Sequence, residues 1–66
     1  MQFEPKTVYY AECAKTGFRI IKHAPLSRSP EYAAWHPKLG YLAFRLSSAK
    51  AAAMVCRENL GKVNGQ

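Results

Sequence analysis

Two apolar segments of this chain carry arginine and aromatic side chains at positions that can share one surface. Arg19 and Ile21 lie in the first segment, and Tyr41 and Arg45 lie in the second. An arginine fork matches phosphate oxygens and guanine edges, and an aromatic ring can stack on an unpaired base. These residue types together favour contact with nucleic acid. The alternative is structural, because strands prefer aromatic and β-branched residues and a tyrosine on a solvated sheet face often serves cross-strand packing.

The stretch from residue 28 to 38 holds a second group of such side chains. Tyr32 and Trp35 stand near arginine and lysine there, and these types are frequent hot spots of protein interfaces and also grip single-stranded nucleic acid. The two rings can instead fold back to fill the open end of a small core. The candidate binding residues of both groups are Arg19, Ile21, Arg28, Tyr32, Trp35, Lys38, Tyr41 and Arg45.

No arrangement of residues typical of catalysis or metal binding is visible. His23 and His36 have no acid or nucleophile at a fixed spacing, and no cysteine or histidine pair has the close spacing of a zinc site. Cys13 and Cys56 can form one disulfide, but a reducing compartment favours two thiols. A chain of 66 residues also has little room for an enclosed active site. We therefore expect a protein that is not an enzyme and uses no cofactor and no metal.

Charge and length restrict the partner and the location. Ten lysines and arginines against four acidic residues give a net charge of +6, which favours an anionic partner, although this charge can simply keep a small protein soluble. No apolar run approaches the roughly 18 residues of a membrane span, and the first residues lack the apolar region of a secretory signal. We expect one cytoplasmic domain over residues 1–66 without a membrane partner, with a frayed tail at residues 62–66.

The first half of the chain predicts a β-hairpin. Residues 6–14 and 18–23 are rich in β-branched and aromatic residues, and Gly17 between them can adopt a positive φ. A two-residue loop at Thr16 and Gly17 places Cys13 opposite Ile20. One face then holds Tyr9, Ala11, Cys13, Phe18 and Ile20, and the other holds Tyr10, Glu12, Arg19, Ile21 and His23.

The proline-rich connection from residue 24 to 39 predicts one short helix. Ser29, Pro30 and Glu31 have the order of an N-cap, a proline at the first helical position and an acid in the first turn. We expect one or two helical turns that end before His36 and Pro37.

The last third of the chain predicts a strand followed directly by a helix. Alternation over residues 41–46 puts Leu42, Phe44 and Leu46 on one face. Ser47 or Ser48 offers an N-cap, and helix formers continue from residue 49 to 60, where Gly61 can end the helix. The helix stripe expected to face the sheet is Ala49, Ala52, Ala53, Cys56 and Leu60, and the residues expected to point away are Lys50, Met54, Arg57 and Glu58.

These elements predict an α+β fold in the order β-β-short helix or loop-β-α. A three-stranded antiparallel sheet carries one C-terminal helix packed on one face. The uncovered face then carries Tyr10, Arg19, Ile21, His23, Tyr41 and Arg45. Met54 on the outer side of the helix is an unusual solvated residue, and a homodimer that buries it is an alternative assembly.

The order of strand, tight turn, strand, strand and capped helix resembles a known DNA-binding domain. The segment Phe44-Arg45-Leu46-Ser47-Ser48-Ala49-Lys50-Ala51-Ala52 is similar to the N-terminal arm-type DNA-binding domains of phage tyrosine integrases, over roughly residues 7–60. The resemblance implies that the uncovered sheet face enters the major groove through Arg19, Ile21, Tyr41 and Arg45. The proline-rich connection is a departure from that family.

Size and architecture also resemble small phage proteins that disarm bacterial defence, including some anti-CRISPR proteins. The two resemblances imply two partners. The first expectation is a basic binding module for nucleic acid or a nucleoprotein complex, which uses the open sheet face and the 28–38 loop. The alternative is a phage-encoded inhibitor that docks on a protein surface in the host cytoplasm.

Overall fold

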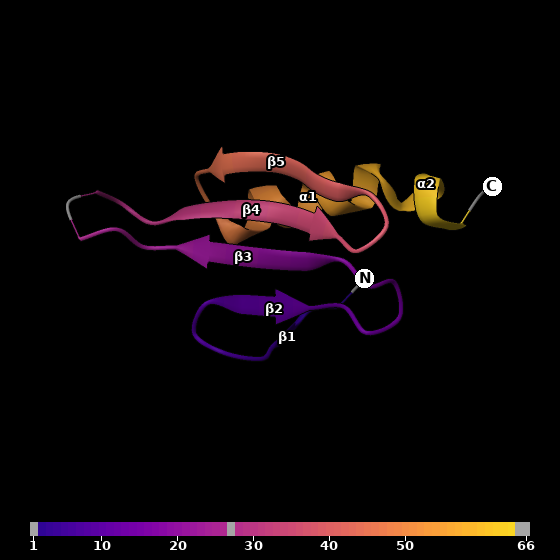
Figure 1. Ribbon diagram of the computed structural model, residues 1–66, viewed down its shortest axis with the longest axis horizontal. Coiled ribbons are helices and arrows are strands. Elements are labelled where there is room, and N and C mark those ends of the chain that lie inside the picture. Colours follow the sequence, from indigo (N-terminus) through magenta and orange to yellow (C-terminus); the bar gives the residue numbers. More distant parts are fainter. Residues whose placement is uncertain (1, 27, 65–66) are drawn as a thin grey trace.

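An antiparallel sheet with two C-terminal helices forms the molecule (Figure 1). The computed structural model describes residues 2–26 and 28–64. Within them, five strands lie side by side in chain order: β1 (Glu4–Pro5), β2 (Tyr10–Glu12), β3 (Arg19–His23), β4 (Glu31–His36) and β5 (Gly40–Leu46). The helices are α1 (Ala49–Glu58) and α2 (Leu60–Asn64). The predicted α+β class, antiparallel sheet and C-terminal helix are confirmed, but the sheet has five strands and not three.

The short helix expected after Ser29 is wrong, because this segment is β4. The strand pairs with β3 on one side and with β5 on the other, so it lies inside the sheet. Two ladders of hydrogen bonds outweigh the weak local preference of a Ser-Pro-Glu sequence for a helix start. Pro30 and Pro37 fall just outside the strand, where a missing N–H breaks no ladder bond.

The expected first strand, residues 6–14, is shortened to β2. Residues 7–9 form a bend, in which the backbone N–H groups of Lys6 and Thr7 donate to the Tyr10 carbonyl at 3.0 and 3.3 Å. The two-residue strand β1 precedes this bend and pairs antiparallel with β2 at the edge of the sheet. Tyr9, expected on the core face, is 63% exposed in this bend.

The β2–β3 hairpin has the predicted faces but a different register. Ala11 lies opposite Ile20 and Glu12 opposite Arg19, so the expected pairing of Cys13 with Ile20 is wrong by two residues. A shift of two keeps every side chain on its face. The loop holds residues 14–17 and closes where Cys13 N–H donates to the Phe18 carbonyl at 2.9 Å. The predicted positive φ of Gly17 is confirmed at 88°.

The core lies between α1 and one face of the sheet. Phe18 and Cys56 are its largest fully buried side chains, and Ala34 and Ala52 are also fully buried. Because alanines face each other, the helix can approach the sheet closely. The predicted stripe is confirmed for Ala52, Ala53, Cys56 and Leu60, whereas Ala49 is exposed.

Helix α1 begins as predicted and ends early. The Ser48 hydroxyl accepts from the Ala51 N–H at 3.0 Å, which confirms the N-cap. The expected end at Gly61 is wrong, because Asn59 interrupts the helix and its side-chain amide donates to the Val55 carbonyl at 2.8 Å. Gly61 belongs to α2. Of the expected tail, residues 62–64 complete α2, and residues 65–66 lie outside the described residues.

Candidate functional site

One face of the sheet carries no helix and is here called the outer face. Helix α1 contacts β3, β4 and β5 from the side of Phe18, Ile20 and Ala34, and Figure 1 shows it behind the sheet. Alternate strand residues therefore point the other way. Strand pairing places them in rows, of which the first is Glu12, Arg19, Trp35 and Tyr41 and the second is Tyr10, Ile21 and Ala33. The predicted uncovered face exists over the described part of the chain.

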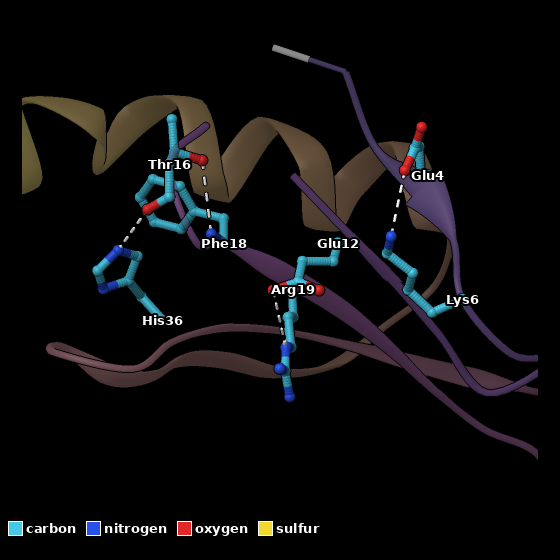
Figure 2. A network of polar contacts seen from close by, with 7 residues as sticks. All are labelled: Glu4, Lys6, Glu12, Thr16, Phe18, Arg19 and His36. Atoms are coloured by element: carbon cyan, nitrogen blue, oxygen red, sulfur yellow. Dashed lines mark hydrogen bonds and ion pairs between the residues drawn. The ribbon is translucent and has the colours of Figure 1, made fainter. Parts of the chain in front are cut away.

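Arg19 is the central side chain of the outer face. Its guanidinium carbon lies 5.0 Å from the centroid of the Tyr10 ring on β2 and 5.0 Å from that of the Trp35 ring on β4. Both distances are within the range of a cation–π contact. Figure 2 shows Arg19 beside Glu12, and the Nε–Oε2 distance is 3.6 Å. The buried Nε atom makes no hydrogen bond within the described structure, so Glu12 acts on it mainly by charge.

Tyr41 and Phe44 form an exposed ring pair beside this row. Their centroids lie 4.8 Å apart at an interplanar angle of 27°, and their side chains are 52% and 62% exposed. Simple alternation predicts Phe44 on the core face, and this prediction is wrong. The β4–β5 register shifts between the pairs Trp35–Tyr41 and Ala34–Ala43, so the alternation along β5 is broken and Phe44 turns outward. The register shifts again before the pair Tyr32–Leu46, next to Arg45, which has a φ of 57°.

A shallow hollow of about 280 Å³ lies next to the ring pair. Ile21, Ala33, Tyr41 and Phe44 are among the residues that line it, and they give it an apolar surface. Polar side chains at the hollow are His23, Glu31 and Arg45. A flat apolar group can thus lie beside hydrogen-bonding groups of both charges.

Carboxylates accompany the arginines of this region. Glu31 Oε2 lies 3.4 Å from Arg45 Nε and 3.4 Å from Arg28 Nη1. Such exposed pairs each contribute roughly 0–1 kcal/mol to stability. Among the described residues, the cations without an ion pair are Lys15, Lys22, Lys38, Lys50, Arg57 and Lys62. The excess positive charge therefore lies mostly away from the middle of the outer face.

The structure brings together most of the predicted binding residues. Those on the outer face are Arg19, Ile21, Trp35, Tyr41 and Arg45. Arg28 lies in the β3–β4 connection beside Glu31, and Lys38 lies exposed in the β4–β5 turn. Tyr32 is partly buried, packs against the core cluster and also lines the hollow beside the ring pair.

The candidate binding residues leave out two contributors to this site. Alternation correctly places Tyr10 on the uncovered face, but the candidate binding residues do not include it. Alternation gives the wrong face for Phe44, because the β4–β5 register shifts between the pairs Trp35–Tyr41 and Ala34–Ala43, and no local pattern reveals this shift.

His36, the last residue of β4 and a member of the 28–38 stretch, has a structural role. His36 is 3% exposed, and its ring lies 4.7 Å from the Phe18 ring. Its Nε2–H donates to the Thr16 carbonyl at 2.7 Å, as Figure 2 shows, and its Nδ1 accepts from the Lys38 N–H at 3.1 Å. These bonds tie the β2–β3 loop to the β4–β5 turn. Both ring nitrogens of His36 therefore serve structural hydrogen bonds.

The two cysteines are free thiols in different environments. Burial, followed by the proximity of Cys13, raises the pKa of Cys56 to about 11. Burial alone would also raise the pKa of Cys13. Hydrogen bonds from the Thr16 hydroxyl and from backbone groups nearby outweigh burial and lower the pKa of Cys13. A cavity of about 520 Å³ adjoins Cys13.

No metal-binding cluster, membrane-spanning helix or similar protein is found for the described chain. In the described part of the chain, no three histidine, cysteine or acidic residues come together to hold a metal ion. No helix of that part is long and apolar enough to cross a membrane. Comparison of the chain with family models, curated proteins and solved structures gives no match.

Proposed function

We propose that this chain is a non-enzymatic binding module that holds nucleic acid, free or within a nucleoprotein complex, on the outer face. The observation that carries the proposal is the Arg19 guanidinium between the Tyr10 and Trp35 rings, in one row with the exposed Tyr41. Rings and guanidinium groups on one surface can contact both parts of a nucleotide, since bases stack on rings and phosphates pair with arginine.

The position of Arg19 suits it to this task. Flanking rings hold its side chain in place, so less conformational entropy is lost when it binds a phosphate or a base edge. Its side chain remains 38% exposed. Arg45, with 72% of its side chain exposed, extends the cationic surface toward the end of β5.

The net charge of +6 supports an anionic ligand more generally. Lysines outside the outer face would attract a polyanion from a distance and would contribute a salt-dependent part of the affinity. We expect measurable binding at low salt that weakens as salt increases.

The test is fluorescence anisotropy with labelled single-stranded DNA, single-stranded RNA and duplex DNA of about 20 nucleotides, a length above the usual site size of a small module. The key variant is Arg19→Gln with Arg45→Gln. The matched control is Lys50→Gln with Arg57→Gln, which removes the same charge from the exposed side of α1. The melting temperature of each variant is measured in parallel, so that a loss of binding can be distinguished from a loss of folding.

We expect the outer-face variant to bind about 10-fold more weakly than the parent chain and the helix variant to lose clearly less. An equal loss in both variants would show that charge alone, and not the outer face, causes binding. If the parent chain binds none of the three probes at about 50 mM salt, the proposal fails. A module that docks on a protein, as a phage-encoded inhibitor would, then becomes the better explanation.

A further inference from the structure

We infer that the ligand of the outer face is a single strand, whose unpaired bases stack on the Tyr41–Phe44 pair. This inference rests on the proposed nucleic-acid function and narrows it to one ligand class. It depends on three features: the exposure of the rings, the size and lining of the hollow beside them, and the placement of acidic side chains.

Exposure of the ring pair is the first feature. Phe44 is 62% exposed and Tyr41 is 52% exposed, although Phe18 and Cys56 are the largest fully buried side chains of the described core. Two rings stacked on each other at 4.8 Å hide one side of each ring and leave other ring surface open to solvent. A base that stacks there covers apolar surface that the fold itself leaves bare.

The hollow beside the rings is the second feature. Its volume of about 280 Å³ lies below that of most drug-sized ligand sites, and Ile21 and Ala33 contribute to its lining. A single flat group such as a base fits a hollow of this size. The polar atoms of His23 and Arg45 lie within reach of the edge of such a group.

The acidic side chains are the third feature and argue against a duplex. Glu12 and Glu31 lie on the outer face and already pair with its arginines. A duplex presents about one phosphate charge per 1.7 Å of its axis and keeps its bases stacked inside, so it would meet both carboxylates with its phosphates. A single strand can turn its bases to the sheet and its phosphates outward. Repulsion by the carboxylates is then reduced while ring contacts are gained.

The experiment compares an oligothymidine of about 12 nucleotides with a duplex of the same length at about 150 mM salt, where purely electrostatic binding is weakened. Anisotropy gives the affinities. Quenching of Trp35, the one tryptophan of the chain and the neighbour of Tyr41 in the row, reports binding at this face. The variants are Tyr41→Ala with Phe44→Ala, and Tyr41→Leu with Phe44→Leu, which keeps apolar volume without rings. The control is Tyr9→Ala, an exposed ring outside the outer face.

We expect the single strand to bind at least about 10-fold more tightly than the duplex and to quench Trp35. Both ring variants should lose about 10-fold or more in single-strand affinity, and Tyr9→Ala should change it less than about 2-fold. If the alanine variant does not fold, the leucine variant decides.

Two failures are distinguishable. Duplex binding that equals or exceeds single-strand binding, or a leucine variant that binds like the parent chain, overturns this inference and leaves the nucleic-acid function standing. Absence of binding to either probe, even at low salt, overturns both.

Discussion

Replacing Arg19 by glutamine should destabilise the fold far more than loss of an ordinary surface arginine. The guanidinium carbon lies 5.0 Å from each of two ring centroids, and a cation–π contact contributes about 0.5–1 kcal/mol at an exposed site and about 2 kcal/mol when desolvated. Because the side chain is 38% exposed, we take about 0.5–1 kcal/mol for each ring. The Glu12 pair at 3.6 Å adds about 0–1 kcal/mol. The expected loss in the free energy of unfolding is about 1–3 kcal/mol.

Urea unfolding followed by circular dichroism measures this loss. A domain of this size rarely has more than about 3–5 kcal/mol of stability, so the change is a large fraction of the total. The melting temperature should fall by about 5–20 °C, since each kcal/mol shifts it by about 4–8 °C. The control is Arg57→Gln on the exposed side of α1, where Arg57 makes no ring contact or ion pair with the described residues, and the free energy of unfolding should change by less than about 0.5 kcal/mol.

A double-mutant cycle assigns the loss to the ring contact. Arg19→Gln and Trp35→Leu, separately and together, should show a coupling free energy of about 0.5–1 kcal/mol. Arg19→Lys keeps the charge but not the planar guanidinium, so it should recover only part of the loss. A coupling below about 0.3 kcal/mol, or a control variant as damaging as Arg19→Gln, would refute the proposed role of the rings.

Three further substitutions test the turns, the cap and the core. Gly17→Ala should lower the free energy of unfolding in a urea titration by about 1–3 kcal/mol, because φ is 88° and the added Cβ would lie 3.3 Å from His36 Nε2. A loss under about 0.5 kcal/mol would contradict a constrained turn. Ser48→Ala should cost about 1 kcal/mol by removing the N-cap acceptor, whereas the neighbouring Ser47→Ala should be nearly neutral, and equal costs would argue against the cap. Burial raises the pKa of the Cys56 thiol from 9.0 to about 11, so above pH 9 the unfolded chain releases a proton that the folded chain retains. Stability should therefore fall by about 2–3 kcal/mol between about pH 9 and 11, relative to a Cys56→Ala variant measured in parallel, and parallel profiles would exclude this linkage.

Sequence patterns within a few residues predicted the elements that depend only on neighbouring residues. The strand at residues 41–46 follows from its alternation, and the start of α1 follows from Ser48, whose side chain must satisfy a free N–H group wherever a helix begins there. Gly17 correctly predicts a positive φ, because a residue without a Cβ adopts this conformation at no steric cost. The placement of Arg19 on the uncovered face also follows from alternation. The predicted register was wrong by two residues, but a shift of two keeps each side chain on its face, so the placement is correct.

Two features that complete the site were beyond local patterns. Segment Glu31–His36 became a strand because β3 and β5 both pair with it, and neither neighbour can be read from the segment itself. That strand supplies Trp35, the second ring on Arg19. Phe44 lies on the outer face because the β4–β5 register shifts between Tyr41 and Ala43, so simple alternation no longer holds along β5.

By itself, the amino-acid sequence determined a small basic α+β chain with a capped helix and an arginine on an uncovered sheet face. Only the tertiary structure decided which rings surround that arginine and which carboxylates pair with it. The physical reason is that alternation and capping act within a few residues. Strand order and bulges depend on hydrogen bonds between segments that meet only in the folded chain.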